Sequence, residues 1–142
     1  MDVASIASPV ITLLASTVVG PVPSGATYLC DTAAANMVVT LPNIAGNPGA
    51  LGYTYSFVKI AGANTLQFIV TPGSGNTFFG LVSDTSAATP AMTAKMSGGT
   101  VSIVASAVNS LGAHVTFTAV STGAGSGSYA FSGATFGTFT LA

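Results

Sequence analysis

Ionisable side chains are almost absent from this sequence. Lysine, arginine, aspartate and glutamate make up 4% of the 142 residues, whereas about 25% is usual for soluble domains. Glutamate, arginine and tryptophan do not occur, and the charged residues are Asp2, Asp31, Asp84, Lys59 and Lys95. Clustered lysine and arginine side chains bind nucleic-acid backbones and anionic membrane surfaces. We therefore expect neither a nucleic-acid nor a membrane partner.

The chain has one cysteine, Cys30, and one histidine, His114. A single cysteine forms no disulfide within the chain, and we expect it in the core as a small apolar side chain. One cysteine, one histidine and three separate aspartates make neither a zinc site nor a calcium loop within one chain. No G-x-S-x-G segment is present. We predict that the protein is not an enzyme and has no catalytic residue, cofactor or metal, although a metal shared between subunits through His114 or an aspartate stays open.

What the sequence does contain is apolar. Hydrophobic residues form 49% of the chain, the mean hydropathy is +0.72, and the formal net charge is −1. Large weakly polar surfaces without charge repulsion associate with one another. We therefore expect a self-associating subunit rather than a dispersed monomer.

Short segments rich in β-branched and aromatic residues alternate with Gly, Pro, Asn and Ser clusters, and no window has helical periodicity. The pattern predicts strands at residues 10–19, 27–31, 36–41, 53–60, 66–71, 77–83, 100–107, 113–121, 128–132 and 135–141. Such spacing is typical of all-β folds. The predicted fold class is an antiparallel β-sandwich or a jelly-roll-like domain with extended terminal segments.

One structural domain is expected, with three parts. Residues 1–24 form an N-terminal strand or arm, residues 25–122 the β-sandwich core, and residues 123–142 a glycine-rich hinge followed by aromatic C-terminal strands. The apolar stretch near the N-terminus follows an acidic "MD" start and contains Pro9. We therefore expect neither a signal peptide nor a membrane-spanning helix there.

Alternation of side chains indicates which faces are buried. Val115, Phe117 and Ala119 share one face of a strand, and this row is expected in the core. Tyr53, Tyr55 and Phe57 form a second, aromatic row. This second row either belongs to the core or packs across a subunit boundary, and the sequence leaves both interpretations open.

Five segments in order resemble a module of phage virion proteins, found in trimeric tail-fibre and capsid-decoration subunits. They are "VVTLP" (38–42), followed by a Gly/Pro loop, "YTYSFVKI" (53–60), "LQFIV" (66–70), "GNTFFG" (75–80) and "GGTVSIVAS" (98–106). The resemblance implies a structural virion component that packs as a homotrimer around a threefold axis. It carries over no catalytic residue.

Together these observations lead to the hypothesis of a capsid decoration, or cement, subunit on the outer capsid surface of a virion. Its expected partners are further copies of itself, in a homotrimer, and the major capsid protein, whose neighbouring subunits it would bridge. The predicted interface residues are apolar and aromatic: Val10, Ile11, Leu13, Leu14, Tyr53, Tyr55, Phe57, Phe131, Phe136 and Phe139.

Two alternatives stay open. One is a tail-fibre or receptor-binding domain that recognises a host glycan, with exposed aromatic residues of "GNTFFG" or "YAFSG" in its site. The other is a self-assembling coat or filament subunit.

Overall fold

The computed structural model describes residues 9–20, 25–32, 37–62, 67–71, 75–84, 91–95, 101–104, 112–135 and 139–141. Within these ranges the chain is all-β, as predicted, and its one helical element is a short 3-10 turn, Pro48–Ala50. No helix in the described part of the chain is long and apolar enough to cross a membrane. The strands are β1 (Val10–Leu13), β2 (Thr17–Val18), β3 (Ala26–Thr32), β4 (Met37–Thr40), β5 (Thr54–Gly62), β6 (Gln67–Thr71), β7 (Asn76–Asp84), β8 (Ala91–Lys95), β9 (Val101–Val104), β10 (His114–Gly123), β11 (Ser126–Thr135) and β12 (Phe139–Leu141).

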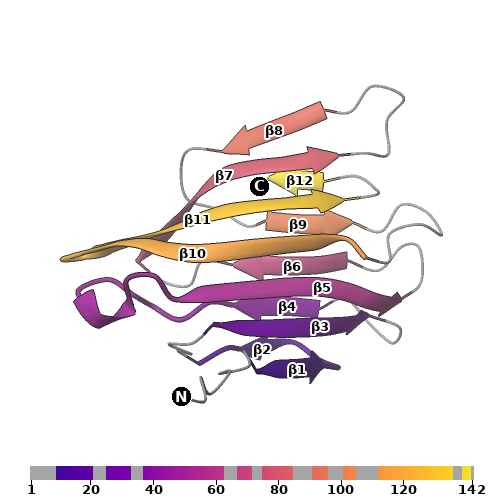
Figure 1. Cartoon of the computed structure of the whole chain (residues 1–142), viewed down its shortest axis with the longest axis horizontal. Helices are drawn as coiled ribbons and strands as arrows, with labels where there is room; N and C mark the ends of the chain where they lie inside the picture. Colours follow the sequence, from indigo (N-terminus) through magenta and orange to yellow (C-terminus); the bar gives the residue numbers. More distant parts are fainter. Residues whose placement is uncertain are drawn as a thin grey trace, which may run out of the picture.

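The strands form two sheets that lie one behind the other in Figure 1. The seven-stranded sheet has the order β1-β3-β5-β10-β11-β7-β8, and the five-stranded sheet has the order β12-β9-β6-β4-β2. Strands β1 and β2 are edge strands of different sheets, and Figure 1 shows them at the same end of the molecule. The two layers therefore end together on the N-terminal side.

The first six strands alternate between the two sheets. Strands β1, β3 and β5 are parallel neighbours in one sheet, and β2, β4 and β6 are parallel neighbours in the other. After one strand in each sheet, the chain re-enters the first sheet in its original direction. Successive strands within the same sheet are therefore parallel. Strand β7 is also parallel to β11, whereas β5–β10, β10–β11, β7–β8, β6–β9 and β9–β12 are antiparallel. The sheets are therefore mixed, and the expectation of an antiparallel fold is wrong for the N-terminal half.

The core lies on the inner face of the seven-stranded sheet and against β4. Strand β3 alternates strictly between buried and partly exposed residues. Val115, Phe117 and Ala119 of β10 are buried, which confirms the row predicted from the sequence. Met37 and Val39 of β4 belong to the same buried cluster, so both sheets contribute to one core.

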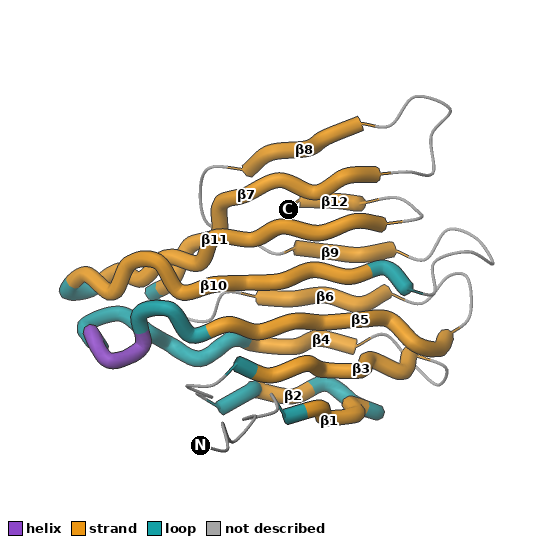
Figure 2. The backbone as a smooth tube through the Cα atoms, in the orientation of Figure 1, coloured by secondary structure: helices purple, strands orange, loops and turns teal. Residues whose placement is uncertain are grey.

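The glycine-rich segment near residue 123 is a tight hairpin rather than the predicted hinge. Strands β10 and β11 continue to its tip, where Thr122 pairs with Gly127 and Gly123 pairs with Ser126. Gly125 in the turn has a φ of 80°, a left-handed conformation that glycine adopts without strain. Figure 2 shows this hairpin extending at one end of the molecule, beside the loop that contains the 3-10 turn.

Candidate functional site

The aromatic row of β5 belongs to the core of the chain itself. Tyr55 and Phe57 are completely buried, and Tyr53 is partly buried against the same cluster. Phe57 stacks on Tyr28 with ring centroids 5.1 Å apart and meets Phe117 edge-on at 5.9 Å. Neighbouring strands of the same sheet therefore cover this row, and the subunit-boundary interpretation is wrong for Tyr55 and Phe57.

Phe131, a further predicted interface residue, is also buried within the chain and packs against Phe78 and Phe117. Phe136 lies outside the described residues. Phe139 begins β12, and only its backbone is described.

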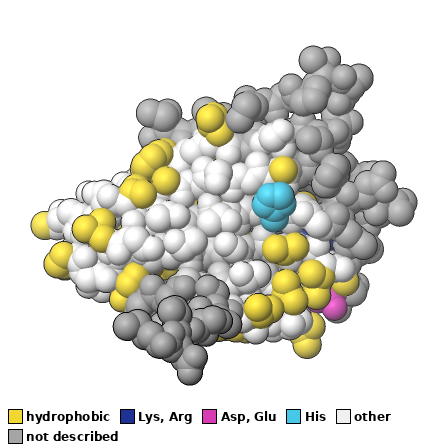
Figure 3. Space-filling view, in the orientation of Figure 1, with side chains coloured by type: hydrophobic (Ala, Val, Ile, Leu, Met, Phe, Trp, Pro, Cys, Tyr) yellow, Lys and Arg dark blue, Asp and Glu magenta, His cyan; other side chains and the backbone are white. Residues whose placement is uncertain are grey.

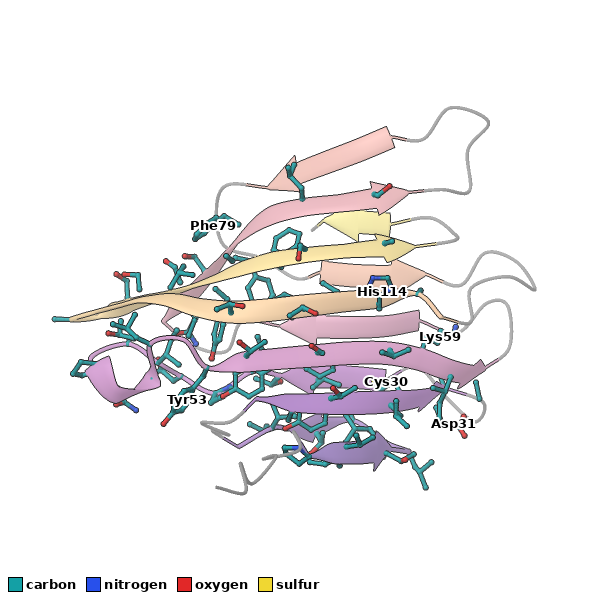
Figure 4. All side chains as sticks on the ribbon, viewed as in Figure 1. Cys30, Asp31, Tyr53, Lys59, Phe79 and His114 are labelled. Atoms are coloured by element: carbon teal, nitrogen blue, oxygen red, sulfur yellow. The ribbon has the colours of Figure 1, made fainter. Side chains whose placement is uncertain are left out.

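The isolated polar residues occupy separate places. Cys30 is buried, as expected, and burial raises the pKa of its thiol to about 12. His114 is exposed on the outer face of the seven-stranded sheet, and its Nδ1 lies 3.2 Å from the carbonyl oxygen of Gly112. Figure 4 shows Asp31 at the end of β3, apart from His114. No metal-binding group of three or more His, Cys, Asp or Glu side chains and no pocket was found among the described residues.

Lys59 is the feature that the sequence reasoning missed. Its side chain is only 1% exposed, and burial lowers the pKa of its ammonium group. The signal was present in the sequence, because Lys59 continues the alternation of Tyr53, Tyr55 and Phe57 and therefore lies on the inner face. A lysine is not expected in a core, although the alternation assigns this position to the core.

Several hydrogen bonds hold the segment 41–53 where it meets the β10–β11 hairpin and the start of β7. The Pro42 carbonyl oxygen accepts hydrogen bonds from the Tyr129 hydroxyl at 2.8 Å and from Asn76 Nδ2 at 3.2 Å. Asn76 Oδ1 accepts a further bond from the Ile44 amide. The Gly52 amide donates a hydrogen bond to the Ala119 carbonyl oxygen at 2.8 Å, so hydrogen bonds hold the loop near both of its ends.

The three most exposed large apolar side chains among the described residues lie at the edge formed by β1, β2 and the short connection between them, which we call the N-terminal edge. Val10 is 64% exposed, Leu14 72% and Val18 70%, whereas Ile11 is 39% exposed. Leu13 lies opposite Cys30 in the parallel register and packs partly against the core. Of the ten predicted interface residues, the structure thus brings Val10, Ile11, Leu13 and Leu14 together at one edge.

The outer face of the seven-stranded sheet has a different character. Figure 3 shows it as mostly uncharged, with hydrophobic side chains in separate groups around His114. Hydroxyl groups pair across its strands, because Ser56 Oγ lies 3.0 Å from Thr116 Oγ1 and Thr77 Oγ1 lies 3.0 Å from Ser128 Oγ. Phe79 is an exposed aromatic residue on the strand that carries Thr77.

Comparison with known proteins gave no match for this chain among protein-family models, curated proteins or solved structures. A function must therefore be inferred from the surfaces described above, and the N-terminal edge carries the most exposed aliphatic side chains among the described residues.

Proposed function

We propose that the protein is a structural virion component, a capsid decoration subunit that stabilises a phage head by bridging neighbouring subunits of its shell. One observation carries this proposal: a nearly uncharged chain presents large aliphatic side chains together at an open sheet edge, at Val10, Leu14 and Val18. Burying such side chains against a partner is favourable by about 25 cal/mol per Å². With a net charge of −1, little repulsion opposes the approach of neighbouring copies.

The proposed action is mechanical and involves no turnover. Apolar contacts and main-chain hydrogen bonds would hold the subunit on the outer capsid surface, with the major capsid protein as partner. A specific contact of this kind buries about 1,600 Å² in total. Repetition over the shell lattice then multiplies a modest affinity through avidity.

The finer description of the fold belongs to the same proposal. The buried cluster draws on strands of both sheets, which favours a β-sandwich. The parallel pairing among β1 to β6 departs from the antiparallel path of a jelly roll. The number of copies that the sequence resemblance implies is three.

The test is rebinding of the purified protein to phage heads that lack it. We expect saturable binding, a higher temperature of head rupture, and retention of the protein when NaCl is raised from about 0.1 M to about 1 M, because screening weakens only ionic contacts. Electron microscopy of the heads should place the added density outside the shell. Absence of binding would refute the proposal, and release by salt would replace the apolar mechanism with an ionic one.

A glycan-binding tail-fibre domain is the second candidate, and the position of Phe79 favours it. Phe79 is 36% exposed, whereas Phe78, Tyr129 and Phe131 are buried, so the "YAFSG" segment offers no exposed aromatic ring. Aromatic rings beside hydroxyl groups present both an apolar surface and hydrogen-bonding partners to a sugar. Binding on a glycan array that Phe79→Ala abolishes and that Leu81→Ala, a second exposed position on β7, preserves would support this candidate. An array without any bound glycan would exclude it for the glycans tested.

A further inference from the structure

Both sheets end in an edge strand on the N-terminal side of the molecule. Strand β1 pairs only with β3 and strand β2 only with β4 among the described strands, so each has one open side. The main-chain groups on the open side of an edge strand are free to pair with a further strand. The N-terminal edge therefore offers hydrogen-bonding groups as well as apolar side chains.

The parallel register shows which residues of β1 direct their main-chain groups outward. The Pro9 carbonyl oxygen accepts a hydrogen bond from the Thr27 amide at 2.9 Å. Main-chain groups in a strand alternate in direction, so Ile11 and Leu13 also face β3. Val10 and Thr12 consequently point their amide and carbonyl groups away from the sheet.

Natural edge strands are usually protected by lysine, by proline within the strand or by a β-bulge. Strand β1 contains Val10, Ile11, Thr12 and Leu13, with no charge, no proline and no break in its register with β3. Strand β2 is likewise uncharged. The short length of both strands limits the open surface, but nothing within these two strands repels an identical edge.

We propose that the N-terminal edge pairs with the same edge of a second copy of this chain, about a twofold axis normal to the sheets. Such an axis brings two copies of β1 together antiparallel, which is the self-complementary arrangement of a twofold contact. With Ile11 on the axis, Val10 lies opposite Thr12 of the second copy, and these outward-pointing residues exchange both main-chain hydrogen bonds. Registers centred on Val10 or Thr12 align fewer outward-pointing residues within β1.

The same axis also brings the β2 edges toward each other, because β1 and β2 end the two sheets on the same side (Figure 1). Leu14 and Val18, the two most exposed aliphatic residues near this edge, would then lose contact with water. One contact thus closes both edges and covers the N-terminal apolar residues. A second copy is the occupant that matches this edge in hydrogen bonding, in apolar character and in absence of charge.

Disulfide trapping tests the register in the purified protein. Residues that face each other on the axis form a non-hydrogen-bonded antiparallel pair with Cα atoms about 4.5 Å apart, within the range of a disulfide. We expect Ile11→Cys to give a covalent dimer on mild oxidation at least about tenfold faster than Val10→Cys. Val10 is the matched control because it is more exposed yet lies off the axis. Equal rates, or no dimer from Ile11→Cys, would overturn the proposal; the buried Cys30 supplies no competing thiol.

Removal of the outward amide tests the contact without a new cysteine. Proline is tolerated in an edge strand where the amide faces away from the sheet, so Thr12→Pro should leave the far-ultraviolet circular dichroism unchanged. We expect it to halve the mass measured by light scattering, whereas Thr12→Val, which keeps the amide, should keep the wild-type mass. A wild-type mass of one or three times 13.8 kDa would overturn the proposal, whereas two times, or six times for trimers paired through this edge, would support it. This outcome is independent of the virion role, because no phage particle enters either experiment.

Discussion

At the scale of single residues, the buried cation Lys59 makes stability depend on pH. Burial lowers the pKa of its ammonium group below the ordinary value of 10.5. Between the folded-state pKa and 10.5, the unfolded chain holds a proton that the folded chain has released. Raising the pH through this window therefore increases the contribution of Lys59 to stability. Cys30 acts in the opposite direction above pH 9, because burial raises its thiol pKa to about 12.

Lys59→Met isolates the lysine contribution from that of Cys30. We expect the free energy of unfolding of the wild type, minus that of Lys59→Met, to rise as the pH passes from the lowered folded-state pKa of Lys59 toward 10.5. Urea titrations at several pH values measure this difference. Val58→Met, at the neighbouring partly exposed position, serves as the control and should follow the pH profile of the wild type. A difference that stays constant with pH would contradict the assignment.

At the scale of elements, the loop 41–53 is tied to both β7 and β11 because Asn76 and Tyr129 donate to the same acceptor in it. Both side chains donate to the Pro42 carbonyl oxygen, so either one alone still satisfies it. Removing both leaves this partly buried carbonyl group without a side-chain donor, which lowers stability. The energies of the two substitutions should therefore be coupled.

We expect Asn76→Ala to lower the free energy of unfolding by about 2 kcal/mol and Tyr129→Phe by about 1 kcal/mol. The double variant should lose about 0.5–1 kcal/mol more than the sum of the two. Urea denaturation of all four proteins completes the cycle. Thr77→Val, which removes a partly exposed hydroxyl group next to Asn76, should cost less than about 0.5 kcal/mol. Simple additivity would mean that the two donors do not share the carbonyl in solution.

At the scale of the whole molecule, the pairing of distant segments sets the folding rate. Strand β7 pairs with β11, and β5 pairs with β10, each across a long stretch of chain. The entropy of loop closure must be lost before such contacts stabilise the chain, so folds dominated by non-local and parallel pairings fold slowly.

We therefore expect refolding to take roughly a second or longer in water at 25 °C. Stopped-flow circular dichroism or tyrosine fluorescence can follow it, because the chain has four tyrosines and no tryptophan. Cys30→Ala provides a control for intermolecular thiol reactions during refolding. Completion within about a millisecond would show that the non-local pairings do not limit the rate.

Also at the scale of the whole molecule, only some of the predicted interface residues lie together on the surface. Val10, Ile11, Leu13 and Leu14 belong to an apolar terminal segment, and they do form an edge. Tyr55, Phe57 and Phe131 are aromatic, and aromatic residues occur both in interfaces and in cores. Composition cannot separate the two outcomes, because burial against one's own chain and burial against a partner use the same side chains.

The sequence by itself determined that the chain is all-β, where most strands lie and which side chains alternate inward, because these properties follow from neighbouring residues. Even the burial of Lys59 was contained in that alternation. Only the tertiary structure decided that the N-terminal strands run parallel, that a glycine-rich segment is a hairpin tip, and that β1 and β2 end both sheets on the same side. Alternation is identical in parallel and antiparallel strands, and the choice of partner depends on the whole path of the chain.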